Sequence, residues 1–122
     1  KHFSVSGIDL ISLIAPTTTD ERLESICESA RGFIYAVSRA GVTGARESTS
    51  GTAEQLVVRA RDFTDLPIAV GFGISTAKQI ADVWRYADAA VVGSAIVTEI
   101  EKAETASDSV AAVENFVRGL FI

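Results

Sequence analysis

Hydrophobic and polar positions along the chain follow two alternating patterns. Short, continuous apolar runs recur four times, at residues 8–14, 32–37, 68–72 and 88–92, and such runs are typical of buried strands in a parallel sheet. After each run, apolar residues are spaced three and four apart, which is the pattern of an amphipathic helix. The sequence therefore predicts four consecutive strand-then-helix units.

The helices of these units are marked by their caps and apolar stripes. Their expected positions are after Thr19 or Asp20, about 52–64, after Ser75 or Thr76, a short helical turn at 95–101 and a final helix near 107–120. The expected apolar stripes are Leu23, Ile26 and Cys27; Leu56, Val57 and Ala60; and Ile80, Val83 and Trp84. Trp84 and Phe116, on helix faces, are predicted to be core residues.

The order of the units limits the fold to two α/β architectures. Right-handed crossovers between parallel strands give either an open, doubly wound sheet or four βα units of a (β/α)8 TIM barrel, a half-barrel with outer helices. No linker rich in proline, glycine or charge divides the chain. Residues 1–122 are therefore expected to form a single domain.

Composition narrows the functional classes. Apolar residues make up 48% and charged residues 22%, which is ordinary for a globular domain, and no apolar run is long enough to span a membrane. The net charge is −5 and the basic residues are scattered singly, which argues against a nucleic-acid partner. The single cysteine, Cys27, fits a reducing compartment, so a cytoplasmic location is expected. No metal site or cofactor is predicted.

The amino terminus carries an expectation of its own. The chain contains no methionine and begins Lys1-His2-Phe3. We therefore expect it to be a fragment, a processed chain or an engineered piece of a longer protein.

Glycines follow three of the four predicted strands. Gly41 and Gly44 come after the second, Gly71 and Gly73 after the third, and Gly93 after the fourth, within the segment AVVGSAIV. Ligands of parallel α/β proteins bind at the carboxyl ends of the strands. The short helix that begins at Ser94 would add free amides and the positive end of a helix dipole. Three such loops together favour a phosphate site over simple tight turns.

Four longer segments carry a family resemblance. They are LIAPTTTDERL (13–23), GFIYAVSRAGVTGAR (32–46), LPIAVGFGIST (66–76) and ADAAVVGSAIV (87–97). In order and spacing, these segments resemble the tryptophan synthase alpha subunit, and the chain is similar to its C-terminal half, βα units five to eight. The resemblance implies a TIM-barrel lyase that cleaves indole-3-glycerol phosphate to indole and glyceraldehyde 3-phosphate, in tryptophan biosynthesis.

The resemblance also implies roles for particular residues. The phosphate-binding backbone positions of the family fall on Gly44, Gly73, Gly93 and Ser94. The substrate-contacting positions fall on Tyr35, Thr43, Phe72 and Val91: Tyr35, Phe72 and Val91 on the indole side, and Thr43 on the loop that closes over the substrate. A tryptophan synthase beta subunit is implied as a partner.

The chain departs from the family at the catalytic groups. The family's catalytic glutamate and aspartate belong to the N-terminal half of the barrel, so the resemblance assigns no catalytic residue to this chain. Removal of a general acid or base costs about 10²–10⁴-fold in rate, so the chain alone is expected to be inactive. Asp20 and Glu21 are interpreted as first-turn helix charges, and Glu47 as a solvated loop charge.

A half-barrel leaves two sheet edges and one sheet face without partners. We therefore expect self-association or pairing with the missing N-terminal half, in place of a stable monomer. The alternative function is a non-catalytic half-barrel that self-associates or complements an N-terminal half. A more remote alternative is an unrelated binder of sugar phosphates on the same architecture.

Overall fold

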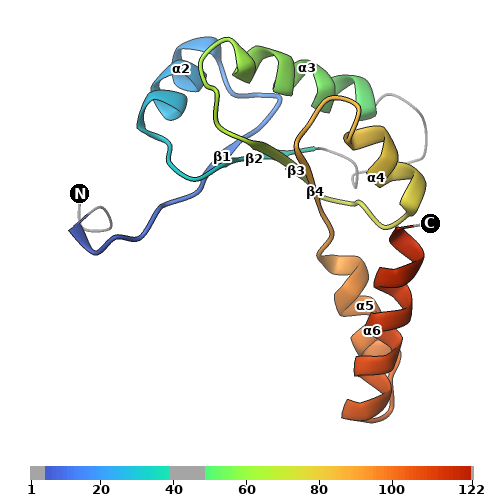
Figure 1. The fold of residues 1–122 in the computed structure, drawn as a ribbon. Helices are drawn as coiled ribbons and strands as arrows, with labels where there is room; N and C mark the ends of the chain where they lie inside the picture. Colours follow the sequence, from blue (N-terminus) through green and yellow to red (C-terminus); the bar gives the residue numbers. More distant parts are fainter. Residues whose placement is uncertain (1–4, 39–48, 122) are drawn as a thin grey trace.

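The structure, a computed structural model, describes residues 5–38 and 49–121. Strands and helices alternate along the described chain as far as α5, which is followed by a second helix, α6 (Figure 1). The elements are β1 (Ser12–Ile14), α2 (Asp20–Ser29), β2 (Ile34–Val37), α3 (Thr49–Arg61), β3 (Ile68–Gly71), α4 (Ala77–Val83), β4 (Ala89–Val91), α5 (Ser94–Lys102) and α6 (Ala106–Leu120). The four predicted βα units are confirmed, although β1 is shorter than the predicted strand 8–14 and Phe72 lies outside β3.

The sheet has the strand order of a partial barrel. Its order is β1-β2-β3-β4, and every neighbouring pair is parallel. When each strand is added on the same side of the last one, right-handed crossovers place all the connecting helices on one face. Figure 1 shows α2, α3 and α4 together on that face. The doubly wound alternative is therefore wrong for the described chain, because it requires helices on both faces.

The core lies between this sheet face and the three helices. Alternate strand residues point into it, and Ile68, the first residue of the interior strand β3, is 0% exposed. From the helices come Leu23, Leu56 and Val57, and Cys27 is also buried, as its spacing predicts. Burial raises the pKa of the Cys27 thiol. The buried strand residues on this face are Ile14, Ile34, Ala36, Ile68 and Val70.

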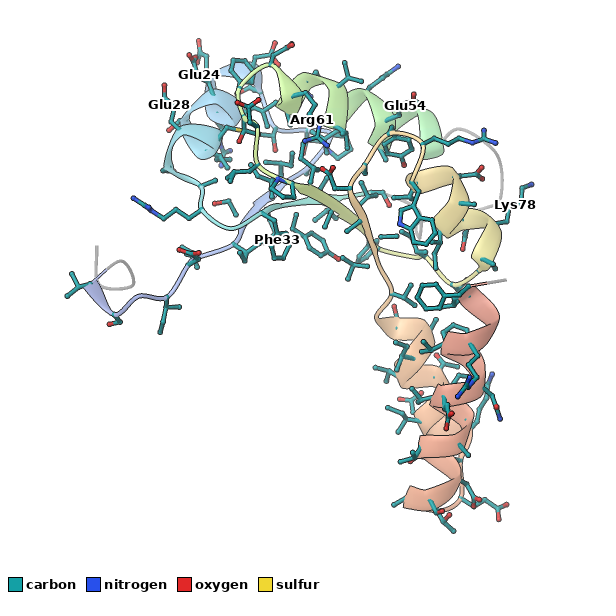
Figure 2. All side chains as sticks on the ribbon, viewed as in Figure 1. Glu24, Glu28, Phe33, Glu54, Arg61 and Lys78 are labelled. Atoms are coloured by element: carbon teal, nitrogen blue, oxygen red, sulfur yellow. The ribbon has the colours of Figure 1, made fainter. Side chains whose placement is uncertain are left out.

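The opposite face of the sheet has no described helix over it. In one row across it, Leu13 pairs with Tyr35, Tyr35 with Ala69, and Ala69 with Ala89. Leu13 is 61% exposed, and Figure 2 shows Phe33 on the side of the sheet away from α2 and α3. We call the side chains of Leu13, Phe33, Tyr35, Ala69 and Ala89 the open face. β1 and β4 are the two edges of the sheet.

Two helix starts are settled by their hydrogen bonds. Thr19 caps α2, since its Oγ1 accepts from the Arg22 amide at 3.4 Å. Thr76 caps α4 in a capping box with Gln79, in which each side chain accepts from the other residue's amide, at 3.2 and 3.1 Å. Of the predicted caps, Thr19 is therefore correct instead of Asp20, and Thr76 instead of Ser75.

The prediction that Trp84 belongs to the core is wrong. Trp84 follows the last residue of α4 as its C-cap, and its side chain is 53% exposed. Its amide still donates to the Ile80 carbonyl, at 3.0 Å, so helical spacing alone does not decide whether its side chain is buried. Phe116 is partly buried against the core cluster, in keeping with its prediction.

The last two helices form a hairpin that leaves the sheet. Figure 1 shows α5 and α6 side by side, extending away from the carboxyl end of β4. No residue of α5 is fully buried, and Val97 and Ile100 on it are exposed. Within the described residues, no helix is long and apolar enough to cross a membrane.

Asp88 ties the amino ends of β3 and β4 together. Its Oδ2 accepts from the Ile68 amide at 2.8 Å and from the guanidinium of Arg61, and Arg61 also donates to the Leu66 carbonyl. The hydrogen bond from Arg61, followed by that from Ile68, holds the pKa of Asp88 below its ordinary value of 3.8. This network fixes the end of the sheet opposite to the predicted ligand site.

Asp88→Asn is expected to remove an acid-dependent part of the stability. Because the folded pKa lies below the unfolded one, this contribution is complete above the unfolded value and is lost as pH falls through the folded pKa. Urea unfolding between about pH 5 and pH 2 measures it. Glu104→Gln, in the turn between α5 and α6, is the control for loss of a surface charge. An unchanged acid slope in Asp88→Asn would contradict this role.

Candidate functional site

A pocket of about 400 Å³ opens at the carboxyl ends of β3 and β4. It lies between the loop that follows β3, the first turns of α5, and α6. The loop contributes Gly73 to the pocket, and α5 contributes its first residue, Ser94. The lining residues are Gly73, Ile74, Ser75, Ser94, Ala95, Thr98, Glu99 and Phe116. Its position agrees with the rule that parallel α/β proteins bind ligands at the carboxyl edge of the sheet.

The β3–α4 loop has an unusual backbone. Phe72 has φ of +90° and Gly73 has φ of +79°. Glycine adopts such values freely, whereas a residue with a side chain is strained there by about 1–3 kcal/mol. Phe72 is nevertheless 53% exposed, so its ring is not held there by burial. Strain of this kind is concentrated at ligand sites.

Gly71, the last residue of β3, makes room for Tyr35. A Cβ at Gly71 would overlap the hydroxyl oxygen of Tyr35 and lie 3.1 Å from Cβ of Val91. The phenol of Tyr35 therefore crosses the sheet over Gly71 and ends beside Val91. This close approach, and not a positive φ, explains the first glycine of GFGIS.

The start of α5 leaves backbone donors without helical partners. Gly93 is its N-cap and makes no side-chain cap. The Gly93 carbonyl accepts from the amides of Ile96 and Val97, at 2.9 and 3.2 Å. The amides of Ser94 and Ala95 come before the first residues whose amides bond within the helix. They are therefore the donors that a helix start offers to an anion. A Cβ built on Gly93 meets no atom within 4 Å, which indicates open space beside it.

The structure brings most of the sequence-predicted residues into two groups. Gly73 and Ser94 line the pocket, and Gly93 directly precedes Ser94. Tyr35 and Val91 meet over Gly71 on the open-face side, where Phe72 begins the next loop. Gly44 and Thr43 lie outside the described residues, as does Glu47. Their assigned roles stay predictions.

Several pocket residues carried no functional signal in the sequence. Ser75 was expected only as a candidate helix cap, and Thr98 and Phe116 looked like ordinary helix residues. Glu99 is a carboxylate in the lining, but its Oε1 lies 3.0 Å from Nζ of Lys102, which balances its charge. Only the pairing of α5 with α6 brings Phe116 beside residues of the two strand-end loops.

Titratable groups with shifted pKa values lie away from this pocket. Burial, then the charges of Glu54 and Asp82, raises the pKa of Tyr86. Asp20 lies in the first turn of α2, as expected, and pairs with Arg59 at 2.8 Å. Among the described residues, no group of three or more histidine, cysteine, aspartate or glutamate side chains could hold a metal ion.

A second pocket, of about 480 Å³, lies on α3. Its described lining residues belong to this one helix: Gly51, Glu54, Gln55, Val58 and Arg59. Among the described residues, no strand end and no second element contributes to this pocket. It therefore carries no argument for a ligand site.

The fold and pocket define a class of protein: a partial (β/α)8 barrel with a candidate ligand site at the carboxyl edge of its sheet. The family model of the tryptophan synthase alpha chain matches residues 1–120. The chain is 52% identical over 108 residues to the tryptophan synthase alpha chain of Methanosarcina acetivorans, and 49% identical over 96 residues to that of Methanocaldococcus jannaschii. It belongs to the tryptophan synthase alpha chain family.

Solved structures agree with this assignment. Tryptophan synthase subunit alpha from Campylobacter jejuni is 30% identical with a TM-score of 0.82, and the match covers 97% of this chain and 46% of that one. A mutant alpha subunit from Pyrococcus furiosus is 34% identical with a TM-score of 0.80, covering 96% and 46%. The two archaeal sequence matches cover 88% and 79% of this chain but 39% and 34% of the relatives. The chain thus spans well under half the length of the curated relatives it matches.

Proposed function

We propose that this chain supplies the phosphate- and indole-binding half of a tryptophan synthase alpha site, as βα units five to eight of the barrel. The substrate would be indole-3-glycerol phosphate, cleaved to indole and glyceraldehyde 3-phosphate. One observation carries the proposal: Gly73 and Ser94, from two successive strand-end loops, line one pocket beside backbone amides without helical partners.

In this proposal the two groups of residues hold the two ends of the substrate. The amides of Gly73, Ser94 and Ala95 would bind the phosphate, with Gly44 from the neighbouring loop. The indole ring would lie on the open-face side, against Tyr35, Phe72 and Val91, and Thr43 would help to close the site.

The proton transfers at the ring and at the glycerol hydroxyl need a general acid and a general base. These would come from the family's N-terminal half, and no metal or cofactor is required. The proposed role of this chain is therefore to bind and orient the substrate. Orientation alone can lower the activation barrier considerably, without any side chain of this chain taking part in proton transfer.

Ser94→Asp is expected to weaken phosphate binding at least about tenfold while leaving α5 folded. A carboxylate at a helix start stabilises the helix through the dipole, yet repels a phosphate a few ångströms away. Repulsion of about 1.4 kcal/mol or more corresponds to at least about tenfold weaker binding. Amide chemical shifts of Gly73, Ser94 and Ala95, followed by NMR during titration with inorganic phosphate, measure it.

Ser107→Asp is the matched control, because it adds the same charge to the first turn of α6, outside the pocket lining. It is expected to leave phosphate affinity within about twofold of the unaltered chain, since charges separated by about a Debye length are largely screened. Phosphate shifts that are absent from the pocket amides, or that survive Ser94→Asp, would refute the phosphate site.

Self-association is the second candidate role, and the open face favours it. Leu13 and Phe33 are 61% and 37% exposed on this face, and a soluble monomer normally covers such apolar surface. Two copies could cover each other, or a tryptophan synthase N-terminal half could cover one; the implied beta subunit would bind outside this face. The two roles differ in what an added N-terminal half restores: turnover under the first, and none under the second.

A further inference from the structure

Ser38 is a buried hydroxyl that neither the family resemblance nor the pocket lining accounts for. It directly follows β2 and is 5% exposed. Its Oγ lies 3.1 Å from the carbonyl oxygen of Gly71 and 3.1 Å from that of Phe72. Its backbone amide also donates to the Gly71 carbonyl, at 3.0 Å. Ser38 thus connects the end of β2 to the strained loop after β3.

The two acceptors are not equally dependent on this hydroxyl. Gly71 O keeps the amide of Ser38 as a donor if the side chain is removed. Phe72 O has the Ser38 hydroxyl as its donor in the described chain. Loss of the hydroxyl therefore acts mainly on the Phe72 carbonyl.

The Phe72 carbonyl belongs to the same peptide unit as the Gly73 amide. A trans peptide is planar, and its C=O and N–H point in opposite directions. Because the carbonyl is held toward Ser38, the Gly73 N–H points away from Ser38. No acceptor in the described part of the chain takes this N–H, and Gly73 lines the pocket.

We infer that Ser38 is a positioning residue: its hydroxyl fixes the Phe72–Gly73 peptide so that the Gly73 amide faces the pocket and Phe72 keeps its positive φ. The inference rests on the proposed function, because the amide it aims is one of the proposed phosphate donors. It adds a residue from the end of a third strand, β2, to the support of the site. The strain at Phe72 is thereby balanced by a specific hydrogen bond rather than by burial.

Ser38→Ala tests this role in the ¹⁵N-labelled chain. We expect it to weaken binding of inorganic phosphate about fivefold, which corresponds to the loss of one ordinary hydrogen bond. The strong intraresidue amide–Hα NOE that marks a positive φ at Phe72 should weaken, and the Gly73 amide signal should shift. Ser38→Thr, which keeps the hydroxyl, should restore the Phe72 NOE and the Gly73 signal of the unaltered chain. A purely structural role would lower the melting temperature without changing the Phe72 NOE or the Gly73 signal.

Ser29→Ala is the matched control. Its hydroxyl is likewise shared between two carbonyl oxygens, those of Ser25 and Ile26 at 3.1 and 3.3 Å, but on exposed α2. The Ser29→Ala variant should change neither the Phe72 NOE nor the Gly73 signal. If Ser38→Ala does not fold, Ser38→Cys, with a weak donor of similar size, takes its place under the same criteria.

Two results would overturn the inference: an unchanged Phe72 NOE, or phosphate affinity in the alanine variant within about twofold of the unaltered chain. Failure of the unaltered chain to bind phosphate would contradict the proposed function instead. In that event, the NOE and the Gly73 signal still decide whether Ser38 sets this peptide.

Discussion

Ile68→Ala is expected to lower the free energy of unfolding by about 2–5 kcal/mol, the usual cost of removing a large side chain from a core. Ile68 is 0% exposed, pairs with Ile34 on the neighbouring strand, and faces the layer of helices. Helices on one side and strands on both sides restrict the collapse that could fill the cavity. Urea unfolding followed by far-UV circular dichroism measures the loss.

Leu13→Ala is the control on the other face of the same sheet. Leu13 is 61% exposed, so its truncation should cost the chain alone no more than about 0.5 kcal/mol. Once a partner covers the open face, the same substitution should lower the free energy of unfolding of the assembly by more than this amount. Equal costs for Ile68→Ala and Leu13→Ala in the dilute chain would contradict the one-sided core.

Much of the fold follows from short-range pattern. The four apolar runs predict the parallel strands because a parallel strand is built from consecutive apolar residues, and the caps at Thr19 and Thr76 follow from hydroxyl groups placed just before helical spacing. The strand order then decides between the two architectures, since it depends on which strands pair. No run of residues contains that information.

The candidate site was predicted less completely than the fold. The glycines at the strand ends point to Gly73, Gly93 and Ser94, because glycine and a helix start each have a local chemical reason to serve an anion. Ser38 and Phe116 could not be predicted, since their importance arises from contacts with segments more than twenty residues away. Phe72 was expected as an indole contact from the family resemblance, but its strained backbone is visible only in three dimensions.

Trp84 shows where helical spacing misleads. It continues the stripe of Ile80 and Val83, and its amide still donates to the Ile80 carbonyl, yet at the C-cap of α4 its side chain is 53% exposed. Spacing predicts which residues share a helix face, but it does not predict how far neighbouring elements cover that face. A stripe that reaches the last turn therefore says little about its final member.

The central claim is that this chain binds the substrate and that an N-terminal half supplies the reacting groups. Its most direct test mixes the chain with the N-terminal half of a tryptophan synthase alpha chain, such as that of Methanosarcina acetivorans, and measures indole release from indole-3-glycerol phosphate. The Ser94→Asp chain serves as the negative control and the Ser107→Asp chain as the positive one.

We expect turnover by the mixture at least about 10²-fold above that of either half, because one missing acid or base alone costs that much. Ser107→Asp should restore turnover equally well, and Ser94→Asp should not. Light scattering on the same samples reports which halves have paired. No turnover from a mixture in which this chain remains a tight homodimer would contradict the claim and favour the self-associating role.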